Sequence, residues 1–410
     1  MYIYITTRKI KMPPKIAILG AGPAGLTIAS LLHKNNVPFS IYDLRPAPSS
    51  DLLSLPSGSL DLHEESGLLA LEACGLTSAY KKLPGVCTEE TLITGKDGIL
   101  KYQDDGHGGT RPEVPRNDLL HLLLSSLPSL VKWEHKLLSC TASDGKWTVT
   151  FQGRDPATFD LVIGADGAWS RVRSVITDVH PHFSGISYIG MTIPHLPRYP
   201  DLNRLVGTGS FWALGSNKAI MTHRGSLDSV HFYLMIQSAS TAYFEEKNLD
   251  PRDRQALGQQ LLTKPEFFAD WAPILKEMIR VACEDNHDPV CDVEMKPLYM
   301  FNPGQRWDHV QGMTLVGDAA HLMTPFAGEG VNLAMLDSLE LANNIITTYK
   351  DKGGEGMDDA VKAYEEKMFS RTEKKMKKTL RNQKILFADD AVEAIVRMFN
   401  SFGQPAPPAN

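Results

Sequence analysis

The sequence predicts an α/β protein with two domains, one built on a parallel sheet and one on an antiparallel sheet, followed by a long C-terminal helix. Three observations carry this prediction. Between Lys15 and Asp43 an apolar strand, a glycine-rich turn, a helix and a second apolar strand follow one another, as in a parallel sheet covered on both faces. Between 181 and 291 strand-like segments succeed one another without a crossover helix, which indicates antiparallel pairing. From 358 to 399 apolar residues recur at helical spacing.

The composition is that of a globular protein and excludes several classes of function. The chain has 410 residues, 42% apolar and 22% charged, which rules out a mainly disordered or fibrous chain. Its 42 basic and 48 acidic residues give a net charge of −6, so we expect no nucleic-acid partner. Five cysteines are too few for a disulfide scaffold and favour a reducing compartment, the cytoplasm. No apolar run is long enough to predict membrane insertion, and we expect a monomer.

The first part of the chain is expected to alternate strands and helices. Short apolar runs predict strands, and leucine-rich stretches at three- and four-residue spacing predict helices. Asp-Gly pairs at 97–98 and 144–145 indicate hairpin turns. In order, we expect a strand at 15–19, a helix at 26–33, a strand at 38–42, a helix at 60–79, a hairpin at 91–102, a helix at 117–127, and strands at 131–138, 147–151 and 161–163.

The second part is expected to contain the antiparallel sheet and then a return to the first domain. Strands are predicted at 186–193, 210–214, 219–222 and 230–236, a helical stretch at 252–281, a strand at 313–316, a helix at 328–349, and one or two long helices at 358–399. The resulting organisation is a flexible extension (1–14), the first part of the first domain (15–180), a substrate domain of antiparallel sheet plus helices (181–300), the second part of the first domain (301–350), a bridging helix (351–400) and a frayed tail (401–410).

The turn after the first strand carries the first motif. Gly20, Gly22 and Gly25 form a G-x-G-x-x-G pattern that opens a helix. In a dinucleotide site the first two glycines allow a tight turn and close approach to a pyrophosphate, and the third lets helix and strand pack closely. The helix N-terminus offers free amides to the anion. Asp43 follows the second strand, where a carboxylate can accept hydrogen bonds from a ribose and would repel a 2′-phosphate. This predicts a Rossmann-like domain that binds FAD or NAD; a structural glycine turn is the less favoured alternative.

Two further strand–turn–helix segments carry glycine and aspartate. Gly317 and Asp318 follow a strand and precede a second glycine-rich turn, Gly328 to Asn332, at the start of a helix. The carboxylate of Asp318 can hold a ribityl hydroxyl, and the amides of that turn can face an anion or a ring oxygen. Asp166 lies in the third segment. Together these turns fit one extended cofactor threaded between opposite ends of the chain.

These motifs together resemble those of the group A flavoprotein monooxygenases, the para-hydroxybenzoate hydroxylase-like aromatic hydroxylases. That family has an N-terminal G-x-G-x-x-G, an internal D-x-x-x-G-A-D-G-x-x-S-x-V-R and a C-terminal Gly-Asp motif, and all three occur here in that order. The resemblance spans about 15–364. Within the family it is closest to the Tet(X)-type tetracycline-inactivating monooxygenases, through segments 58–63, 112–119 and 317–332.

The resemblance implies a set of FAD-binding residues. Asp61 and Arg116 would contact FAD, with Arg116 near the ribityl–flavin region, and Asp318 would hold the ribityl or pyrophosphate portion. An acid–arginine pair of the family reads Asp43-Leu44 here, with Arg45 one place later. The complete set expected to bind the cofactor is Gly20, Gly22, Ala24, Gly25, Asp43, Arg45, Asp61, Arg116, Asp166, Gly317, Asp318, Pro325, Gly328, Gly330, Val331 and Asn332.

The expected substrate site departs from that of the tetracycline-inactivating enzymes. A glutamine and an arginine that contact the drug there correspond to Gly190 and Lys218 here, and a histidine corresponds to His231. We expect the substrate between the antiparallel sheet and the turn that holds Pro325 and Phe326, which can form an apolar wall. Lys218 and His231 would reach across from the sheet, although His231 could equally face solvent. Weak or no turnover of tetracycline follows from these departures.

The resemblance implies an FAD-dependent monooxygenase with NADPH and O2 as co-substrates. NADPH would visit transiently to reduce FAD, and a flavin hydroperoxide would hydroxylate an aromatic, phenolic or polyketide-like small molecule, with tetracycline as one candidate. The protein then supplies placement, water exclusion and electrostatics, so we name no catalytic side chain. One alternative is a flavin-dependent reductase or dehydrogenase on the same fold, which would release peroxide without an oxygenated product. A non-enzymatic binding protein on this fold is the less favoured alternative.

Three remaining features favour structural explanations. His321 in the Gly-Asp turn more often packs structurally than acts as a base. Cys283, His287 and Cys291 match no common zinc spacing, so we expect no metal site. The basic run at 374–381 is interleaved with acidic residues nearby, which indicates a solvated helix more than an RNA or membrane patch.

Overall fold

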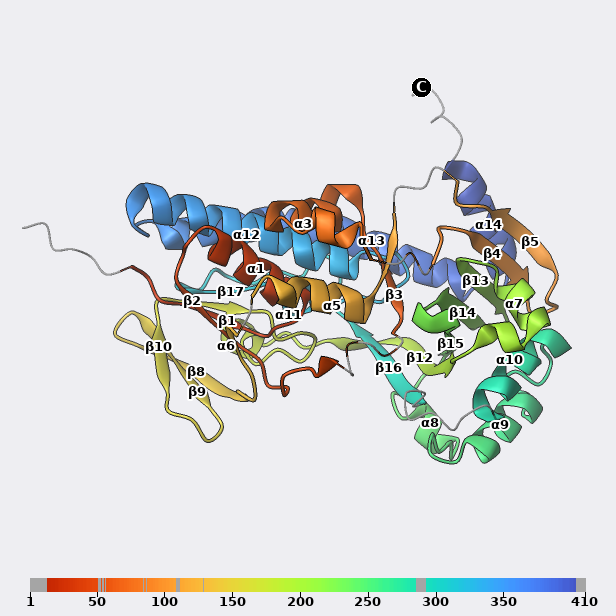
Figure 1. Cartoon of the computed structure of the whole chain (residues 1–410). Coiled ribbons are helices and arrows are strands. Elements are labelled where there is room, and N and C mark those ends of the chain that lie inside the picture. Colours follow the sequence, from red (N-terminus) through yellow and green to blue (C-terminus); the bar gives the residue numbers. More distant parts are fainter. Residues whose placement is uncertain are drawn as a thin grey trace, which may run out of the picture.

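The structure, a computed structural model, describes residues 13–402 apart from 51, 52, 54, 56, 84, 86, 108–110, 128 and 285–292. Most of the expected N-terminal extension, the end of the expected tail, and His287 and Cys291 lie outside the described residues. Within the described residues the strands form four sheets. The molecule is elongated, with a parallel sheet toward one end and the largest sheet at the other (Figure 1).

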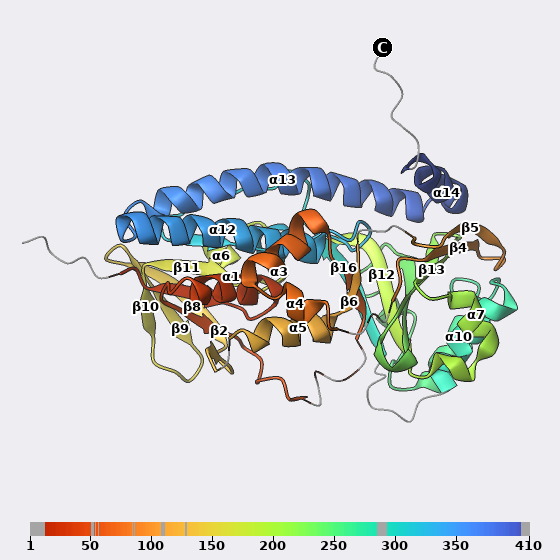
Figure 2. The same cartoon turned by 45° about the horizontal axis from the view of Figure 1, so that its top comes forward.

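The parallel sheet confirms the predicted strand–turn–helix organisation. Its strand order is β17-β11-β1-β2-β7, and every neighbouring pair is parallel. The central strands are continuous buried runs, as expected when helices and loops cover both faces. Helices α1 and α12 lie side by side over this sheet (Figure 2). The elements are β1 (Ile16–Leu19), α1 (Pro23–Lys34), β2 (Phe39–Tyr42), β7 (Val131–Lys132), β11 (Leu161–Gly164), β17 (Met313–Leu315) and α12 (Gly330–Lys352).

Two predicted elements are broken into shorter ones. The expected strand at 131–138 is split between β7 and the antiparallel sheet of β8 (Leu137–Ser143), β9 (Lys146–Phe151) and β10 (Ala157–Phe159), because the chain turns at Glu134, which has φ of 57°. The expected helix at 60–79 is also wrong. It is replaced by β3 (Ser59–Asp61), the π-helical turn η1 (Glu64–Leu68), α3 (Leu69–Cys74) and α4 (Thr77–Tyr80), since Gly75 takes the left-handed conformation that ends α3.

A two-stranded sheet carries the segment that contains Asp61. Strand β3 pairs antiparallel with β6 (Glu113–Pro115), which places Asp61 opposite Glu113. Strand β6 leads directly into α5 (Arg116–Ser125), so Arg116 begins that helix. This small sheet therefore sets Asp61 and Arg116 close to the parallel-sheet domain that carries the glycine motifs.

The largest sheet has seven strands in the order β16-β12-β15-β14-β13-β4-β5. Strands β12 (His182–Ile193), β15 (Val230–Gln237), β14 (Lys218–Arg224) and β13 (Ser210–Gly215) are antiparallel neighbours, as predicted. Strand β16 (Glu294–Met300) extends one edge. The hairpin of β4 (Thr91–Gly95) and β5 (Leu100–Asp104) joins the other edge, with β4 parallel to β13. The sheet is therefore mixed, not purely antiparallel. The sequence does not reveal the parallel pair of β4 and β13, because two distant segments that pair in parallel are not joined by a short turn.

The two faces of this sheet have different coverings. Along β15, Phe232 and Leu234 pack among the helices α7 (Pro200–Val206), α9 (Arg254–Thr263) and α10 (Pro273–Glu284). The alternate residues Tyr233 and Met235 belong to the opposite face, with α14 (Ala391–Phe402). The expected helical stretch at 252–281 is thus two helices, since a proline follows the end of α9 and another begins α10. The remaining elements are α6 (Arg173–Ile176), η2 (Leu196–Arg198), η3 (Ser226–Asp228), α8 (Tyr243–Glu246) and α11 (Asp318–His321).

The C-terminal part consists of two helices, α13 (Met357–Leu386) and α14. Helix α13 runs beside α12 along the molecule and ends next to α14 (Figure 2). Near its end, Gln383 Nε2 donates to the carbonyl of Ser184 in β12 (2.8 Å) and Asn382 Nδ2 donates to the carbonyl of Phe326 (2.9 Å). The helix therefore contacts both parts of the molecule. Among the described residues, no helix is both long and apolar enough to cross a bilayer.

A buried carboxylate fixes α13 to the segment before β17. Glu365 accepts hydrogen bonds from His309 Nδ1 (2.7 Å) and Thr314 Oγ1 (2.7 Å), and His309 Nε2 lies 3.1 Å from an oxygen of Asp358. Burial alone would lower the pKa of His309, but the two carboxylates outweigh it and raise the pKa. The protonated imidazole is therefore the form that the fold favours.

This arrangement predicts a pH-dependent stability. Because the pKa of His309 is raised in the folded protein, its contribution is fully present below the unfolded value, about 6.5, and is lost as pH rises through the folded pKa. We expect His309→Gln to lower the melting temperature by about 2 °C at pH 6, the shift that roughly 1 kcal/mol causes in a domain of this kind, and by much less at pH 9. Equal shifts at both pH values, measured by scanning calorimetry, would contradict this assignment.

Candidate cofactor and substrate site

The three glycines after β1 have two different structural roles. Gly20 has φ of 112°, and a Cβ there would lie 2.1 Å from the carbonyl oxygen of Ala165. A Cβ on Gly25 would lie 1.9 Å from the carbonyl oxygen of Gly20. Protein packing therefore requires both. Gly22, at the N-cap of α1, has no protein atom within 4 Å of such a Cβ. Open space beside a helix N-terminus is what a bound pyrophosphate needs.

Asp43 lies at the end of β2, directly beside this turn. Its side chain is buried, accepts a hydrogen bond from the Ala21 amide (2.8 Å), and is paired with Arg45 through Nε (2.9 Å). Burial by itself would raise the pKa of Asp43, but the hydrogen bonds and charge of Arg45 and the Ala21 amide hold the pKa below its ordinary value. The carboxylate is thus ionised and fixed at the place where a ribose is expected, and Arg45 is half exposed beside it.

The segment with Asp166 supports the Gly-Asp turn from behind. The Asp166 carboxylate accepts hydrogen bonds from Ser170 Oγ (2.5 Å) and the Arg171 amide (2.8 Å), so it holds its own turn together. Arg173 is buried and donates to the carbonyls of Ala319 (3.1 Å) and Ala168 (2.8 Å). Two of the sequence motifs are therefore joined through Arg173, which sequence reasoning did not single out. Any contact of Asp166 with a cofactor would come from its backbone.

The Gly-Asp turn places Asp318 at an exposed position at the start of α11. Gly317 has φ of 60° and lies between α1 and α12, with Ala334 Cβ 3.1 Å and Ala24 Cβ 3.4 Å from the position of a Cβ. Solvent reaches Asp318, but surrounding protein partly desolvates its carboxyl group. This desolvation raises the pKa of Asp318, although the charges of His321 and Arg116 act to lower it. Since no described residue is hydrogen-bonded to the Asp318 carboxyl and solvent reaches it, this group is free to meet a polyol.

His321 belongs to a buried network, as the structural explanation predicted. Its Nε2 lies 2.5 Å from Asp337, which also accepts from Arg371 (2.8 Å) and from the Gly317 amide (3.2 Å). Burial opposes the charge on His321, but Asp337 outweighs it and raises the pKa. The network therefore fixes α11 against α12 and α13.

The second glycine-rich turn is fixed to β3. Asn332 is fully buried, and its Nδ2 donates to the carbonyls of Asp61 (2.8 Å) and Gly328 (3.0 Å) while its Oδ1 accepts from the His63 amide (2.8 Å). The Asn332 side chain is thus occupied, and only its backbone can face a ligand. A Cβ on Gly328 would lie 2.6 Å from an Asp61 oxygen, whereas Gly330 has open space beside it.

Two lysines of α13 hold this turn from the other side. Glu329 is buried and accepts hydrogen bonds from Lys375 (3.0 Å) and Lys378 (2.9 Å). Burial would raise the pKa of Glu329, but these cations lower it. The interpretation of the basic run as a merely solvated helix is therefore wrong for these two residues. Sequence spacing gave no signal because Glu329 and the lysines lie in different helices.

The charge of Arg116 acts on residues of both the cofactor motifs and the seven-stranded sheet. Its amide donates to the carbonyl of Gly58 (3.0 Å), but within the described part of the chain its guanidinium has no protein hydrogen-bond partner and is exposed. Its charge acts on Asp318 and also on His231 and Tyr233 of the seven-stranded sheet. Arg116 therefore lies where the predicted cofactor residues meet the sheet.

The sheet face near Arg116 is aromatic. A Cβ on Gly190 would lie 3.5 Å from the ring of Tyr188 and 3.6 Å from that of Tyr233, and these two rings pack edge to face at 5.7 Å. Tyr188 donates its hydroxyl to Glu294 (2.6 Å). His231 lies on the same face. Gly190 and His231 are thus placed on the same face, and their contact with a substrate stays a prediction.

Lys218 is not part of this wall, and the expectation that it reaches the substrate is wrong. It shares the face of Ile220, which packs among the helices on the other side of the sheet. Its ammonium is buried and donates to the carbonyl of Glu266 (3.3 Å), and its desolvation lowers its pKa. The physical reason is strand alternation, which sends residues of odd and even number to opposite faces.

The turn before the second glycine cluster supplies an apolar element. Phe326 is buried and packs edge to face against Phe387 at 5.5 Å, while Pro325 is exposed. Thr324 Oγ1 donates to Gln383 Oε1 (3.1 Å), so α13 holds this turn as well. Phe326 also belongs to the same apolar cluster as the sheet residues Met221 and Met235, consistent with the expected wall.

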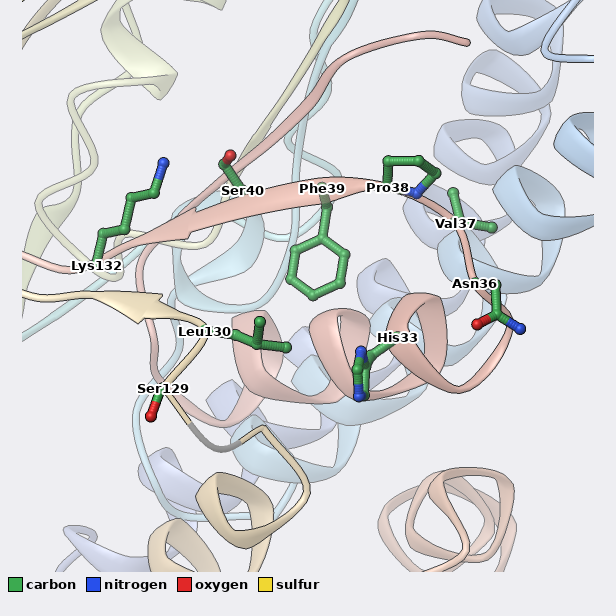
Figure 3. Close-up of a pocket in the computed structure, with 9 residues that line it drawn as sticks. All are labelled: His33, Asn36, Val37, Pro38, Phe39, Ser40, Ser129, Leu130 and Lys132. Atoms are coloured by element: carbon green, nitrogen blue, oxygen red, sulfur yellow. The ribbon is translucent and has the colours of Figure 1, made fainter.

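Two other features lie away from these residues. A shallow hollow of about 490 Å³ at the end of α1 is lined by none of the predicted site residues (Figure 3). It gathers the apolar side chains of Phe39 and Leu130 and the imidazole of His33, with no convergent charged set. In the described part of the chain no group of three or more His, Cys, Asp or Glu side chains is placed to hold a metal ion.

Comparisons with known proteins show the family of the chain. The family model described as "FAD binding domain" matches residues 14–264 and 301–379. The monooxygenase asqM of Emericella nidulans is 34% identical over 440 residues, which cover 94% of this chain and 98% of that protein.

Solved structures share the fold at low identity. HpxO of Klebsiella pneumoniae, solved with FAD and uric acid, superposes with a TM-score of 0.74 at 18% identity, covering 95% of this chain and 92% of that one. The tetracycline destructase Tet(55) gives a TM-score of 0.72, also at 18% identity, covering 95% and 96%. At such identities the likeness concerns the fold alone, so the closer resemblance to tetracycline-inactivating enzymes stays a prediction.

Proposed function

Because this chain belongs to the FAD-binding-domain family and is an FAD-dependent monooxygenase, we propose that it oxygenates a small aromatic, phenolic or polyketide-like molecule held against the aromatic face of the seven-stranded sheet. The observation that carries the proposal is the guanidinium of Arg116, for which the described residues supply no hydrogen-bond partner. Its charge reaches Asp318 in the cofactor motif and His231 and Tyr233 on the sheet. Cofactor and substrate would therefore meet beside Arg116.

The residues fit FAD in an extended conformation. The open space beside Gly22 and the amides at the start of α1 would take the pyrophosphate. Asp43 would hold the adenosine ribose, and Asp318 the ribityl chain. The backbone at Gly330 would face the flavin ring, because this glycine, like Gly22, has open space where a Cβ would lie. When bound, FAD supplies the redox chemistry that uses NAD(P)H and O2.

The protein's own contribution is placement and exclusion of water. The turn at 324–326 and the sheet face with Tyr188 and Tyr233 supply apolar and aromatic surface for a ring. Tyr188 and Tyr233 stay protonated, since burial raises both pKa values. The Tyr188 hydroxyl already donates to Glu294, so Tyr233 is the one of the two that can donate a hydrogen bond to a substrate without carrying charge.

Oxygen incorporation tests this function. Purified FAD-loaded enzyme would be given NADPH, ¹⁸O2 and a panel of phenols and aromatic polyketides, and products would be analysed by mass. We expect at least one panel member to gain a single labelled oxygen with NADPH consumption coupled to product. Stoichiometric hydrogen peroxide with no labelled product would instead favour the flavin-dependent reductase. A colourless protein that cannot be reconstituted with FAD would favour the non-enzymatic binding protein.

Arg116→Ala is expected to weaken FAD binding by about 10- to 100-fold. The variant loses charge-assisted hydrogen bonds, worth about 1.5–3 kcal/mol in total. The matched control is Arg111→Ala, because Arg111 is exposed nearby on the same segment and is not a predicted site residue. FAD affinity would be measured by titrating the apoprotein and following flavin fluorescence. Equal affinity in the two variants would remove Arg116 from the site.

Tetracycline is expected to be a poor substrate. The position that corresponds to the drug-binding arginine holds Lys218, whose ammonium lies on the other face of the sheet. Bidentate recognition of a diketone edge is therefore missing. Coupled oxygenation of tetracycline should be weak compared with the best phenolic panel member, and Lys218→Arg should not improve it. Efficient oxygenation of tetracycline by the wild type would contradict this expectation.

A monomeric enzyme in a reducing compartment, the cytoplasm, completes the proposal. Cys74, Cys87, Cys140 and Cys283 are unpaired and buried. Burial raises the pKa of Cys140 to about 12 and that of Cys283 to about 11, so these thiols stay protonated and unreactive. Light scattering of the yellow protein would report its mass in solution.

A further inference from the structure

We propose that His223 is a second substrate-binding residue, and that with His231 it forms an uncharged imidazole pair that selects substrates with a neutral hydroxyl or carbonyl oxygen over carboxylates. This inference rests on the proposed function and specifies the substrate class of the same site. His223 lies outside the strand that the sequence predicted at 219–222, because β14 in fact continues to Arg224.

The two histidines are direct neighbours across two strands. His223 of β14 is opposite His231 of β15 in the antiparallel register. Alternation along β14 places His223 on the face of Met221, and alternation along β15 places His231 on the face of Tyr233. Both therefore lie on the aromatic side of the sheet, near Arg116. Directly opposed side chains in such a pair have Cβ atoms about 4.5–5.5 Å apart, close enough to contact one ligand.

Each ring is anchored through one nitrogen and leaves the other available. His223 Nδ1 lies 3.2 Å from Ser210 Oγ of β13, and His231 Nδ1 lies 2.9 Å from Thr192 Oγ1 of β12. The anchors come from the strands on either side of the pair, so both rings are oriented. His231 Nε2 is buried without a hydrogen-bond partner. His223 Nε2 also has no hydrogen-bond partner among the described residues, but unlike His231 Nε2 it is not fully buried. A buried polar atom without a partner, such as His231 Nε2, is rare in folded proteins, and a ligand oxygen would supply the partner there.

The surroundings keep both rings neutral. The pKa of each ring is lowered to about 4, with burial as the largest cause; His223 and Arg116 also lower the pKa of His231, and at His223 Asp61 opposes the lowering while Arg116 adds to it. The charged groups that face the pair are thus Arg116 from α5 and Asp61 from β3. Glu294 of β16 is already paired with Tyr188 and Lys296, and Lys218 lies on the other face.

A neutral pair has a defined preference for ligands. A neutral imidazole nitrogen donates to or accepts from an uncharged hydroxyl or carbonyl oxygen. A ligand carboxylate would lose its hydration on binding and would find no cationic donor on this face of the sheet. Burying a charge without a partner is costly. Arg116, the cation whose charge acts on both rings, is assigned to the cofactor. The pair therefore favours a phenol or ketone over the corresponding acid.

The test uses the FAD-loaded full-length enzyme and two matched probes, 2-naphthol and 2-naphthoate. Their affinities would be measured from the change in flavin fluorescence, for the wild type and for His223→Leu, His223→Gln and the exposed control His180→Gln. We expect the wild type to bind 2-naphthol about tenfold more tightly than 2-naphthoate. His223→Leu should weaken 2-naphthol by about tenfold, and His223→Gln, whose amide can still hydrogen-bond, should restore affinity to within about threefold. His180→Gln should behave as wild type.

Two results would overturn the inference. One is a wild type without preference for 2-naphthol; the other is a His223→Leu variant that binds 2-naphthol as tightly as His223→Gln does. FAD content, measured in the same samples, should be unchanged in all variants. Failure of the proposed function would look different, since it would appear as missing FAD or missing oxygenated product, whatever the relative affinities of the two probes.

Discussion

Replacing Gly22 by valine is expected to give a folded protein that retains no FAD. No protein atom lies within 4 Å of a Cβ at this position, so the fold accepts the larger side chain. The same space is where the pyrophosphate would approach the N-terminus of α1, and a valine would fill it. We expect affinity for FAD to fall by more than about 100-fold, or roughly 2.7 kcal/mol.

The measurement is the visible flavin absorbance per polypeptide, with circular dichroism and melting temperature as checks of folding. Gly85→Val is the matched control, because that glycine is exposed and also has no protein atom within 4 Å of a Cβ; it should stay yellow. Gly25→Val should behave differently and unfold, since its Cβ would lie 1.9 Å from the carbonyl oxygen of Gly20. A fully yellow Gly22→Val protein would show that the turn does not hold the cofactor.

Ending the chain at Gly356, before α13, is expected to cause the largest loss of stability. The helix buries a set of large apolar side chains, and each contributes about 1.5–3 kcal/mol. Their sum is comparable to the whole stability of a typical protein, about 5–15 kcal/mol, and the anchors at Glu329 and Asp337 would lose their partners on α13. The buried apolar residues are Val361, Tyr364, Met368, Phe369, Met376 and Leu386.

A second truncation separates the roles of the two C-terminal helices. A chain that ends at Leu386 keeps α13 and loses only α14, which packs on the edge of the seven-stranded sheet. We expect the chain that ends at Leu386 to be soluble and yellow, whereas the chain that ends at Gly356 should be insoluble or poor in flavin. If the chain that ends at Gly356 were a soluble, yellow monomer, α13 would instead be identified as a dimerisation helix.

Local patterns predicted the parallel sheet and the glycine turns well. The strands β1, β2 and β11 are short, largely apolar runs, and Gly25 is needed by a close contact with the carbonyl of Gly20 within one strand–turn–helix unit. In such a unit the sequence itself holds both partners of each contact. The position of the cofactor residues beside one another follows from the same units, because carboxyl ends of neighbouring parallel strands meet at one edge of a sheet.

Contacts between distant segments could not be predicted in this way. The hairpin of β4 and β5 joins β13 in parallel, and Glu329 is paired with two lysines of another helix. Neither contact leaves a short-range pattern. The position of Lys218 could not be predicted for a different reason. Its match to a residue of a related enzyme indicates the strand but not the face of the sheet, since a shift of one residue along a strand moves a side chain to the opposite face. The end of the same strand was placed too early, so His223 was missed.

The position of the cofactor relative to the seven-stranded sheet is tested most directly by a crystal structure of the FAD-loaded enzyme. We expect the adenosine ribose within hydrogen-bond distance of Asp43, the pyrophosphate beside Gly22, and the flavin ring between the turn at 328–332 and the sheet face that carries Tyr233 and His231. Electron density that places the adenine elsewhere, or the flavin ring on the face covered by α9 and α10, would contradict the account.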